Sequence, residues 1–151
     1  MNGPIDRNER AFKPDEFGEL RDIYVLNTDE RDWQRVLDHL HGTDLPLTFR
    51  VDGRPVPLPV SIQEILTLRQ HAAPQLGIDL EGVLLACYFF TPSVIEFDLD
   101  PRDVLRPVQA DQVIAFMQDL ADLLGKPVIL SPENHPEEPL LRREPAAQVV
   151  R

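Results

Sequence analysis

Two runs of strand-forming residues, 83–90 and 94–100, are joined by Thr91-Pro92-Ser93 and constrain the fold more than any other feature. The second run alternates strictly between acidic and apolar residues. Because successive strand residues point to opposite faces, this alternation predicts one acidic face and one apolar face. We interpret residues 82–101 as the central β-hairpin of a small domain. The acids are Glu96, Asp98 and Asp100, and the apolar residues are Ile95, Phe97 and Leu99.

A three-residue loop at Thr91-Pro92-Ser93 sets the register of this hairpin. It pairs Phe90 with Val94, Tyr88 with Glu96, Ala86 with Asp98 and Leu84 with Asp100. The acidic face then also contains apolar and aromatic side chains of the first strand. A loop one residue longer would place the other set of alternate residues of the first strand on the acidic face. The candidate interaction face consists of Glu96, Asp98, Asp100, Tyr88, Phe90 and Leu84.

Helical and strand periodicities elsewhere predict the order β-α-β-β-α-β-β-α-β. Strands are expected at 22–27, 46–51, 54–59, 83–90, 94–100 and 128–131, and helices at 28–41, 61–73 and 110–124. Asn27 or Thr28 is the expected N-cap of the first helix. A connector that contains Gly77 is expected to lead into the central hairpin. The fold class is therefore α+β, a mainly antiparallel sheet with helices packed on one face. Asp52-Gly53 predicts a second hairpin between 46–51 and 54–59. A doubly wound parallel sheet is less favoured, because both hairpins require antiparallel neighbours.

The length of 151 residues fits one domain. Residues 1–21 are polar and interrupted by prolines and a glycine, which predicts a loose N-terminal arm. Residues 22–131 form the expected globular domain. The tail at 132–151 is rich in proline and glutamate and is expected to be extended or disordered.

The formal net charge of −11 argues against nucleic acid and anionic membranes as partners, and favours a basic protein. Alternatively, the acids only keep the protein in solution. The N-terminal residues lack the apolar core of a signal peptide, so a cytoplasmic location is expected. Cys87 lies inside a predicted strand and is expected to be a small buried hydrophobe. Seven glycines leave little material for a nucleotide-binding loop, and no cofactor is expected.

The segment Phe97-Asp98-Leu99-Asp100-Pro101 resembles the metal-binding strand of archaeo-eukaryotic primases and of the polymerase domains of bacterial end-joining ligases. In those families two aspartates hold the catalytic metals, so the resemblance implies Asp98 and Asp100 as metal ligands. It covers about five residues, and the family's Ser-x-His nucleotide motif has no match here. The same acids loosely resemble the DxD start of haloacid-dehalogenase-type phosphatases, but Arg102 replaces the Thr or Val of those enzymes.

Three hypotheses follow. The leading one is a non-catalytic acidic protein that binds, and neutralises, a basic partner, as small bacterial immunity proteins do; this analogy rests on charge and size. The second is a metal-dependent enzyme that acts on phosphoesters or nucleotides through Asp98 and Asp100. The third is a homo-oligomeric structural domain.

Overall fold

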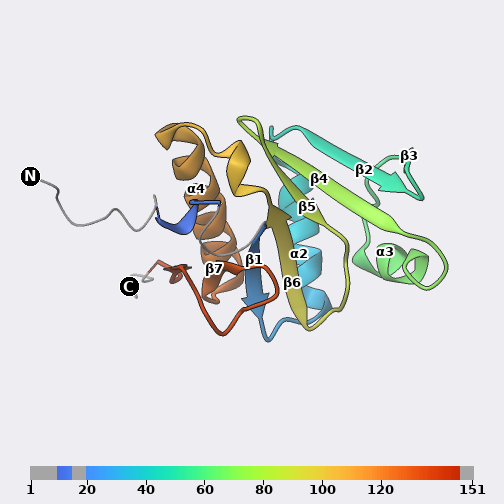
Figure 1. The fold of residues 1–151 in the computed structure, drawn as a ribbon. Coiled ribbons are helices and arrows are strands. Elements are labelled where there is room, and N and C mark those ends of the chain that lie inside the picture. Colours follow the sequence, from blue (N-terminus) through green and yellow to red (C-terminus); the bar gives the residue numbers. More distant parts are fainter. Residues whose placement is uncertain (1–9, 15–19, 147–151) are drawn as a thin grey trace, which may run out of the picture.

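The computed structural model describes residues 10–14 and 20–146 of the chain. Their strands form one sheet in the order β3-β2-β4-β5-β6-β1-β7-β8, and every neighbouring pair is antiparallel (Figure 1). The strands are β1 (Arg21–Leu26), β2 (Leu47–Val51), β3 (Arg54–Pro55), β4 (Pro74–Leu80), β5 (Val83–Cys87), β6 (Val94–Leu99), β7 (Val128–Pro132) and β8 (Leu141–Arg143). The helices are α2 (Glu30–His41), α3 (Ile62–Leu68) and α4 (Pro107–Leu124), with a 3-10 turn, η1 (Pro101–Asp103).

The strict alternation of β6 determines which face of the sheet the helices cover. Ile95, Phe97 and Leu99 are fully buried, whereas Glu96 and Asp98 are only partly buried. The ring of Phe97 meets that of Phe116 in α4 edge to face, with centroids 5.2 Å apart. Figure 1 shows α2 behind β5 and β6. The predicted α+β class with a mainly antiparallel sheet is confirmed.

β1 lies inside the sheet because it has a partner on each edge. It pairs with β6 over six residues and with β7 over four. Ile23 and Val25 are completely buried. We call the sheet face turned away from α2 and α4 the open face; among the described residues, no helix packs on it.

The connector predicted around Gly77 is instead a strand, β4, which pairs with β2 and β5. The prediction was wrong because a glycine inside an apolar run also suggests a turn. Here the glycine serves close packing. A Cβ added at Gly77 would lie 2.6 Å from the Oγ1 of Thr48 on β2, its cross-strand neighbour.

Parts of both predicted terminal segments pack on the domain. Ala11 and Phe12 are buried. The fully buried Arg21 holds this segment, because its Nε donates to the Ala11 carbonyl at 2.7 Å and its Nη2 to the Lys13 carbonyl at 2.6 Å. At the other end, β8 pairs with β7 and extends the sheet by one strand that was not predicted. Residues 1–9, 15–19 and 147–151 of the predicted arm and tail lie outside the described residues.

Among the described helices, none has the length and apolar surface that a membrane-spanning segment needs.

Phe97→Ala should lower the free energy of unfolding by about 3–5 kcal/mol, because it leaves a cavity between β6 and α4. Asp98→Ala, one residue along on the open face, should be near neutral or stabilising. Urea denaturation of both variants measures the difference. Equal losses would mean that the two faces of β6 are not distinguished by burial.

Gly77→Ala should destabilise the protein by about 1–3 kcal/mol, because the new methyl group has no room beside Thr48. Thr48→Ala should recover most of this loss when the two substitutions are combined. A double-mutant cycle with urea denaturation measures the coupling. Additive effects would show that Gly77 is needed for a reason other than this contact.

Candidate interaction face

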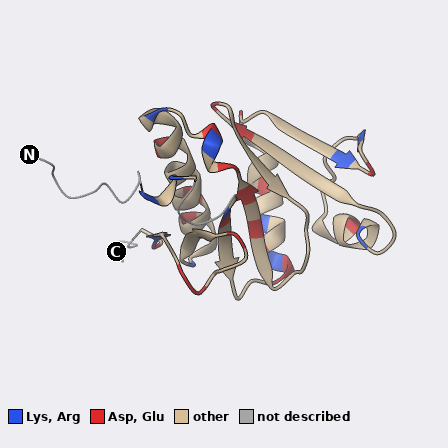
Figure 2. Ribbon diagram, viewed as in Figure 1, with Lys and Arg blue, Asp and Glu red and all other residues tan. Residues whose placement is uncertain are grey.

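Glu96 and Asp98, two of the predicted face residues, lie on the open face of β6, where Figure 2 shows acidic segments along the strand. Ala86 of β5 pairs with Asp98, as the predicted register requires. Leu84 lies two residues before Ala86 on β5 and is 52% exposed. The acids and an exposed aliphatic side chain therefore share one face.

β5 ends at Cys87, earlier than predicted, and the chain between Ala86 and the turn contains one residue more than the predicted register allows. Uninterrupted pairing from Ala86 would place Phe90 opposite Val94, but Thr91 takes that position. The extra residue is accommodated at Phe89, whose φ angle of 57° lies in the left-handed region. The predicted pairing of Phe90 with Val94 is therefore wrong, and a β-bulge interrupts the hairpin before its turn.

The two aromatic residues predicted on this face lie together. The rings of Tyr88 and Phe90 are stacked with centroids 5.5 Å apart. Phe90 is 57% exposed, and the guanidinium of Arg69 lies 5.5 Å from its ring centroid. Burial and the charge of Asp98 both raise the pKa of Tyr88.

Two further residues of this face come from β1 and were not predicted. Asp22 pairs directly with Asp98, and Tyr24 with Glu96, across the β1–β6 ladder. Asp22, Glu96 and Asp98 together form what we call the acidic cluster. Asp22 and Tyr24 are two residues apart, so the sequence could have placed them on one face. Nothing in the sequence indicated that β1 would pair with β6 and bring these two residues beside Glu96.

Asp22 is 2% exposed and one of its carboxylate oxygens accepts from two neutral donors. Its Oδ2 accepts a hydrogen bond from the Tyr24 hydroxyl at 2.8 Å and one from the Asn134 backbone N–H at 2.7 Å. Burial and the bond to Asp22 raise the pKa of Tyr24, so the phenol remains a donor at neutral pH.

Glu96 and Asp98 have less support: a hydrogen bond from Tyr24 lowers the pKa of Glu96 against larger opposing effects, and no hydrogen bond offsets the raised pKa of Asp98. Among the described residues, no arginine or lysine pairs with either carboxylate. Burial, followed by the charges of Asp22 and Asp98, raises the pKa of Glu96 to about 7. Burial, followed by the charges of Asp22 and Glu133, raises the pKa of Asp98 to about 6. Each carboxyl therefore loses its proton only at a higher pH than usual, because ionisation in the folded protein costs free energy.

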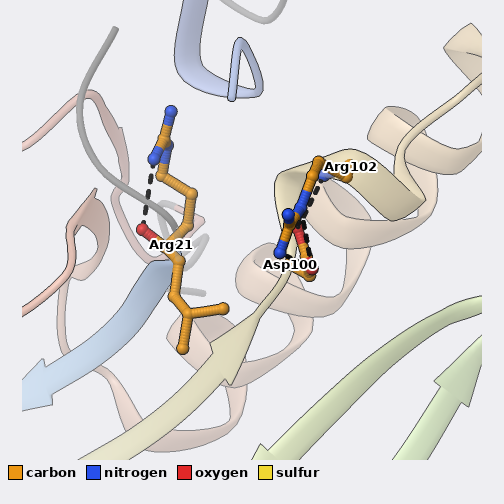
Figure 3. A network of polar contacts seen from close by, with 4 residues as sticks. Arg21, Asp100 and Arg102 are labelled. Atoms are coloured by element: carbon orange, nitrogen blue, oxygen red, sulfur yellow. Dashed lines mark hydrogen bonds and ion pairs between the residues drawn. The ribbon is translucent and has the colours of Figure 1, made fainter. Parts of the chain in front are cut away.

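Asp100 is separate from the acidic cluster. It caps the 3-10 turn by accepting from the Arg102 backbone N–H at 2.9 Å, and its Oδ2 lies 2.8 Å from the Arg102 Nη2. Figure 3 shows the Arg102 side chain folded against this carboxylate. The bonds to Arg102 lower the pKa of Asp100. The pairing of Asp100 with Leu84 is not formed, since β6 ends at Leu99.

The chemistry of the remaining candidates is limited. Asp98 and Asp100 do not converge, and the described residues contain no group of three His, Cys, Asp or Glu side chains arranged to hold a metal. Cys87 is completely buried, which raises the pKa of its thiol to about 12. An open cavity of about 550 Å³ lies beside the β4–β5 turn, and none of the predicted face residues lines it.

Comparison of the chain with protein-family models, with curated proteins and with solved structures found no match in any of the three.

Replacing the two raised carboxyls by amides, Glu96→Gln with Asp98→Asn, should stabilise the protein in a pH-dependent way. The folded state holds these protons more tightly than the unfolded chain, whose pKa values are about 4.5 and 3.8. The wild type therefore loses stability as the pH rises through about 4 to 7, and the amide variant does not. Allowing for solvent screening, we expect a gain of about 1–2 kcal/mol at pH 8 and little at pH 4.5.

Urea denaturation across this pH range measures the gain. Asp119→Asn, at an exposed position on α4, is the matched control and should show no such pH dependence. Parallel stability curves for wild type and amide variant would mean that the two carboxyls titrate as ordinary surface groups.

Proposed function

We propose that this protein is a non-catalytic binding module whose open sheet face docks onto a basic protein partner. One observation supports this most directly: Glu96 and Asp98 are partly buried carboxyls with raised pKa values, no described arginine or lysine pairs with them, and the exposed Leu84 lies on the same face. A partner's lysine or arginine would compensate these charges and shield the apolar surface. The free energy that ionising these carboxyls costs in the unbound protein would then be recovered on binding.

Charge and surface type together favour this class of partner. The net charge of −11 repels nucleic acid and anionic lipid surfaces and attracts basic proteins. Interfaces combine apolar anchors, which provide affinity, with charges that accelerate association. Leu84 and Phe90 would provide the first, and the acidic cluster the second.

The proposed role is neutralisation of that basic partner, as small acidic immunity proteins neutralise toxin domains, an analogy of charge and size. We place this role in the cytoplasm. The metal-enzyme hypothesis has no structural observation in its favour, because Asp100 is paired with Arg102.

The test compares binding to proteins that wild type captures from the source cell, each purified before measurement. Glu96→Lys with Asp98→Lys should slow association at least about tenfold at low salt and weaken its salt dependence. The matched control, Asp111→Lys with Asp119→Lys, makes the same change in net charge at exposed positions on α4. It should have a much smaller effect.

The amide variant of Glu96 and Asp98 guards against a folding defect in the charge-reversed protein. Association rates that are equal in all variants, for every captured protein, would contradict docking through the acidic cluster. Sedimentation of the wild type alone shows whether the occupant of this face is instead a second copy.

A further inference from the structure

Residues 88–93, which connect β5 to β6, are held in place although they belong to neither strand. Thr28 donates twice, from Oγ1 to the Pro92 carbonyl at 2.8 Å and from its backbone N–H to the Ser93 carbonyl at 3.1 Å. The Trp33 indole N–H donates to the Thr91 carbonyl at 3.3 Å. These bonds join the segment to the start of α2.

A fourth bond comes from α3's C-terminal end, where the Arg69 Nε donates to the Phe89 carbonyl at 3.2 Å. Phe89 itself is 3% exposed and packs against Trp33, with ring centroids 5.2 Å apart, and against Phe49, at 6.3 Å. The burial of its ring compensates for the left-handed backbone that the bulge requires.

These hydrogen bonds and the buried ring of Phe89 hold the backbone of residues 88–93 in place, and the side chain of Phe90 points outward from it. The ring is stacked on Tyr88, and Arg69 lies over it, yet 57% of the residue remains exposed. A large aromatic side chain that is ordered and accessible before binding loses little conformational freedom when a partner covers it. Such residues dominate the energetics of many interfaces.

Resting on the docking function proposed above, we propose that Phe90 is the preformed anchor of this interface. It enters an apolar pocket of the basic partner, and cations at the rim of that pocket meet Glu96 and Asp98. Tyr88 stacks on the anchor and follows Ala86, the partner of Asp98, by two residues, so it links the apolar part of the surface to the charged part.

The occupant is a folded basic protein, because the acidic cluster on the open face repels an anionic membrane and repels the same face of a second copy. An exposed aromatic side chain on a face without charges would not discriminate between a basic protein, an anionic membrane and a second copy. The kinetic roles also differ: the acids act on association, and the anchor acts on dissociation.

The first experiment places a photo-cross-linking benzoylphenylalanine at position 84, 90 or 105 of the full chain in lysate of the source cell. Leu105 is 80% exposed near the start of α4 and is the control position. The inference expects one protein to be linked from positions 84 and 90 and not from 105. No product from 90, with a product from 84, overturns the anchor alone. No product from either position overturns both the anchor and the docking face.

The second experiment measures the binding kinetics of the purified cross-linked protein. Phe90→Ala should accelerate dissociation about 30-fold or more, with association little changed. Leu105→Ala, a truncation at a still more exposed position, should change either rate less than about twofold. If Phe90→Ala has no greater effect than Leu105→Ala while Glu96→Gln with Asp98→Asn slows association, the docking face stands and the anchor does not.

A third variant, Thr28→Val, keeps the Phe90 ring but removes the hydroxyl that donates to Pro92. It should lower the NMR order parameters of residues 89–93 and weaken binding several-fold. Loss of order without loss of affinity would contradict preorganisation.

Co-sedimentation with phosphatidylglycerol vesicles tests the remaining alternative, a membrane surface. Vesicle binding that depends on Phe90, or a cross-linked dimer of the chain, would overturn the basic protein as occupant.

Discussion

The six-residue ladder between β1 and β6 determines both the core of this protein and its open face. It runs from the pair Arg21 and Leu99 to the pair Leu26 and Val94. A slip of one residue would turn Ile23 toward solvent and bring Asp22 and Tyr24 under the helices. Burial of an unpaired carboxylate among apolar side chains would be so costly that only the observed register is tenable.

The same ladder creates an electrostatic cost that the fold only partly relieves. It aligns Asp22 with Asp98 and Tyr24 with Glu96, so three carboxylates occupy adjacent positions on two strands. Neutral donors satisfy Asp22, and one of them comes from residue 134, far along the chain. No described donor group does the same for Asp98. Folded proteins tolerate such local costs at sites that act on other molecules, where a ligand completes the interaction.

Sequence reasoning succeeded where a pattern was local and strict. Period-two alternation in 94–100 identified β6 and its two faces, and the Ala86–Asp98 pair was predicted correctly. It failed where structure depends on distant partners. Gly77 looks like a turn residue until Thr48 is known to lie opposite it. Asp22 joins the acids only through a pairing between residues some seventy positions apart.

Two local predictions were wrong for the same physical reason. A short polar side chain can cap a helix, pair with a charge or bond to a distant loop equally well. Thr28 was an expected N-cap, but Asp29 caps α2 and forms a reciprocal pair with Asp32. Thr28 is thereby free to hold the Pro92 carbonyl. Asp100 extends the acidic alternation in the sequence, but Pro101 ends the strand, and Arg102 is near enough to bind its carboxylate.

The β-bulge joins these observations, because it lies where the two halves of the sheet meet. Between β5 and β6 the described residues form a single registered pair, Ala86 with Asp98, and beyond it an isolated bridge at Thr91. Leu84 lies on one side of this junction and Glu96 on the other. The segment that contains Phe90 crosses between them and is bonded to α2 and α3 rather than to either strand. A partner seated there would contact both halves at once, so its binding would stabilise a junction of the sheet that has only one registered strand pair among the described residues.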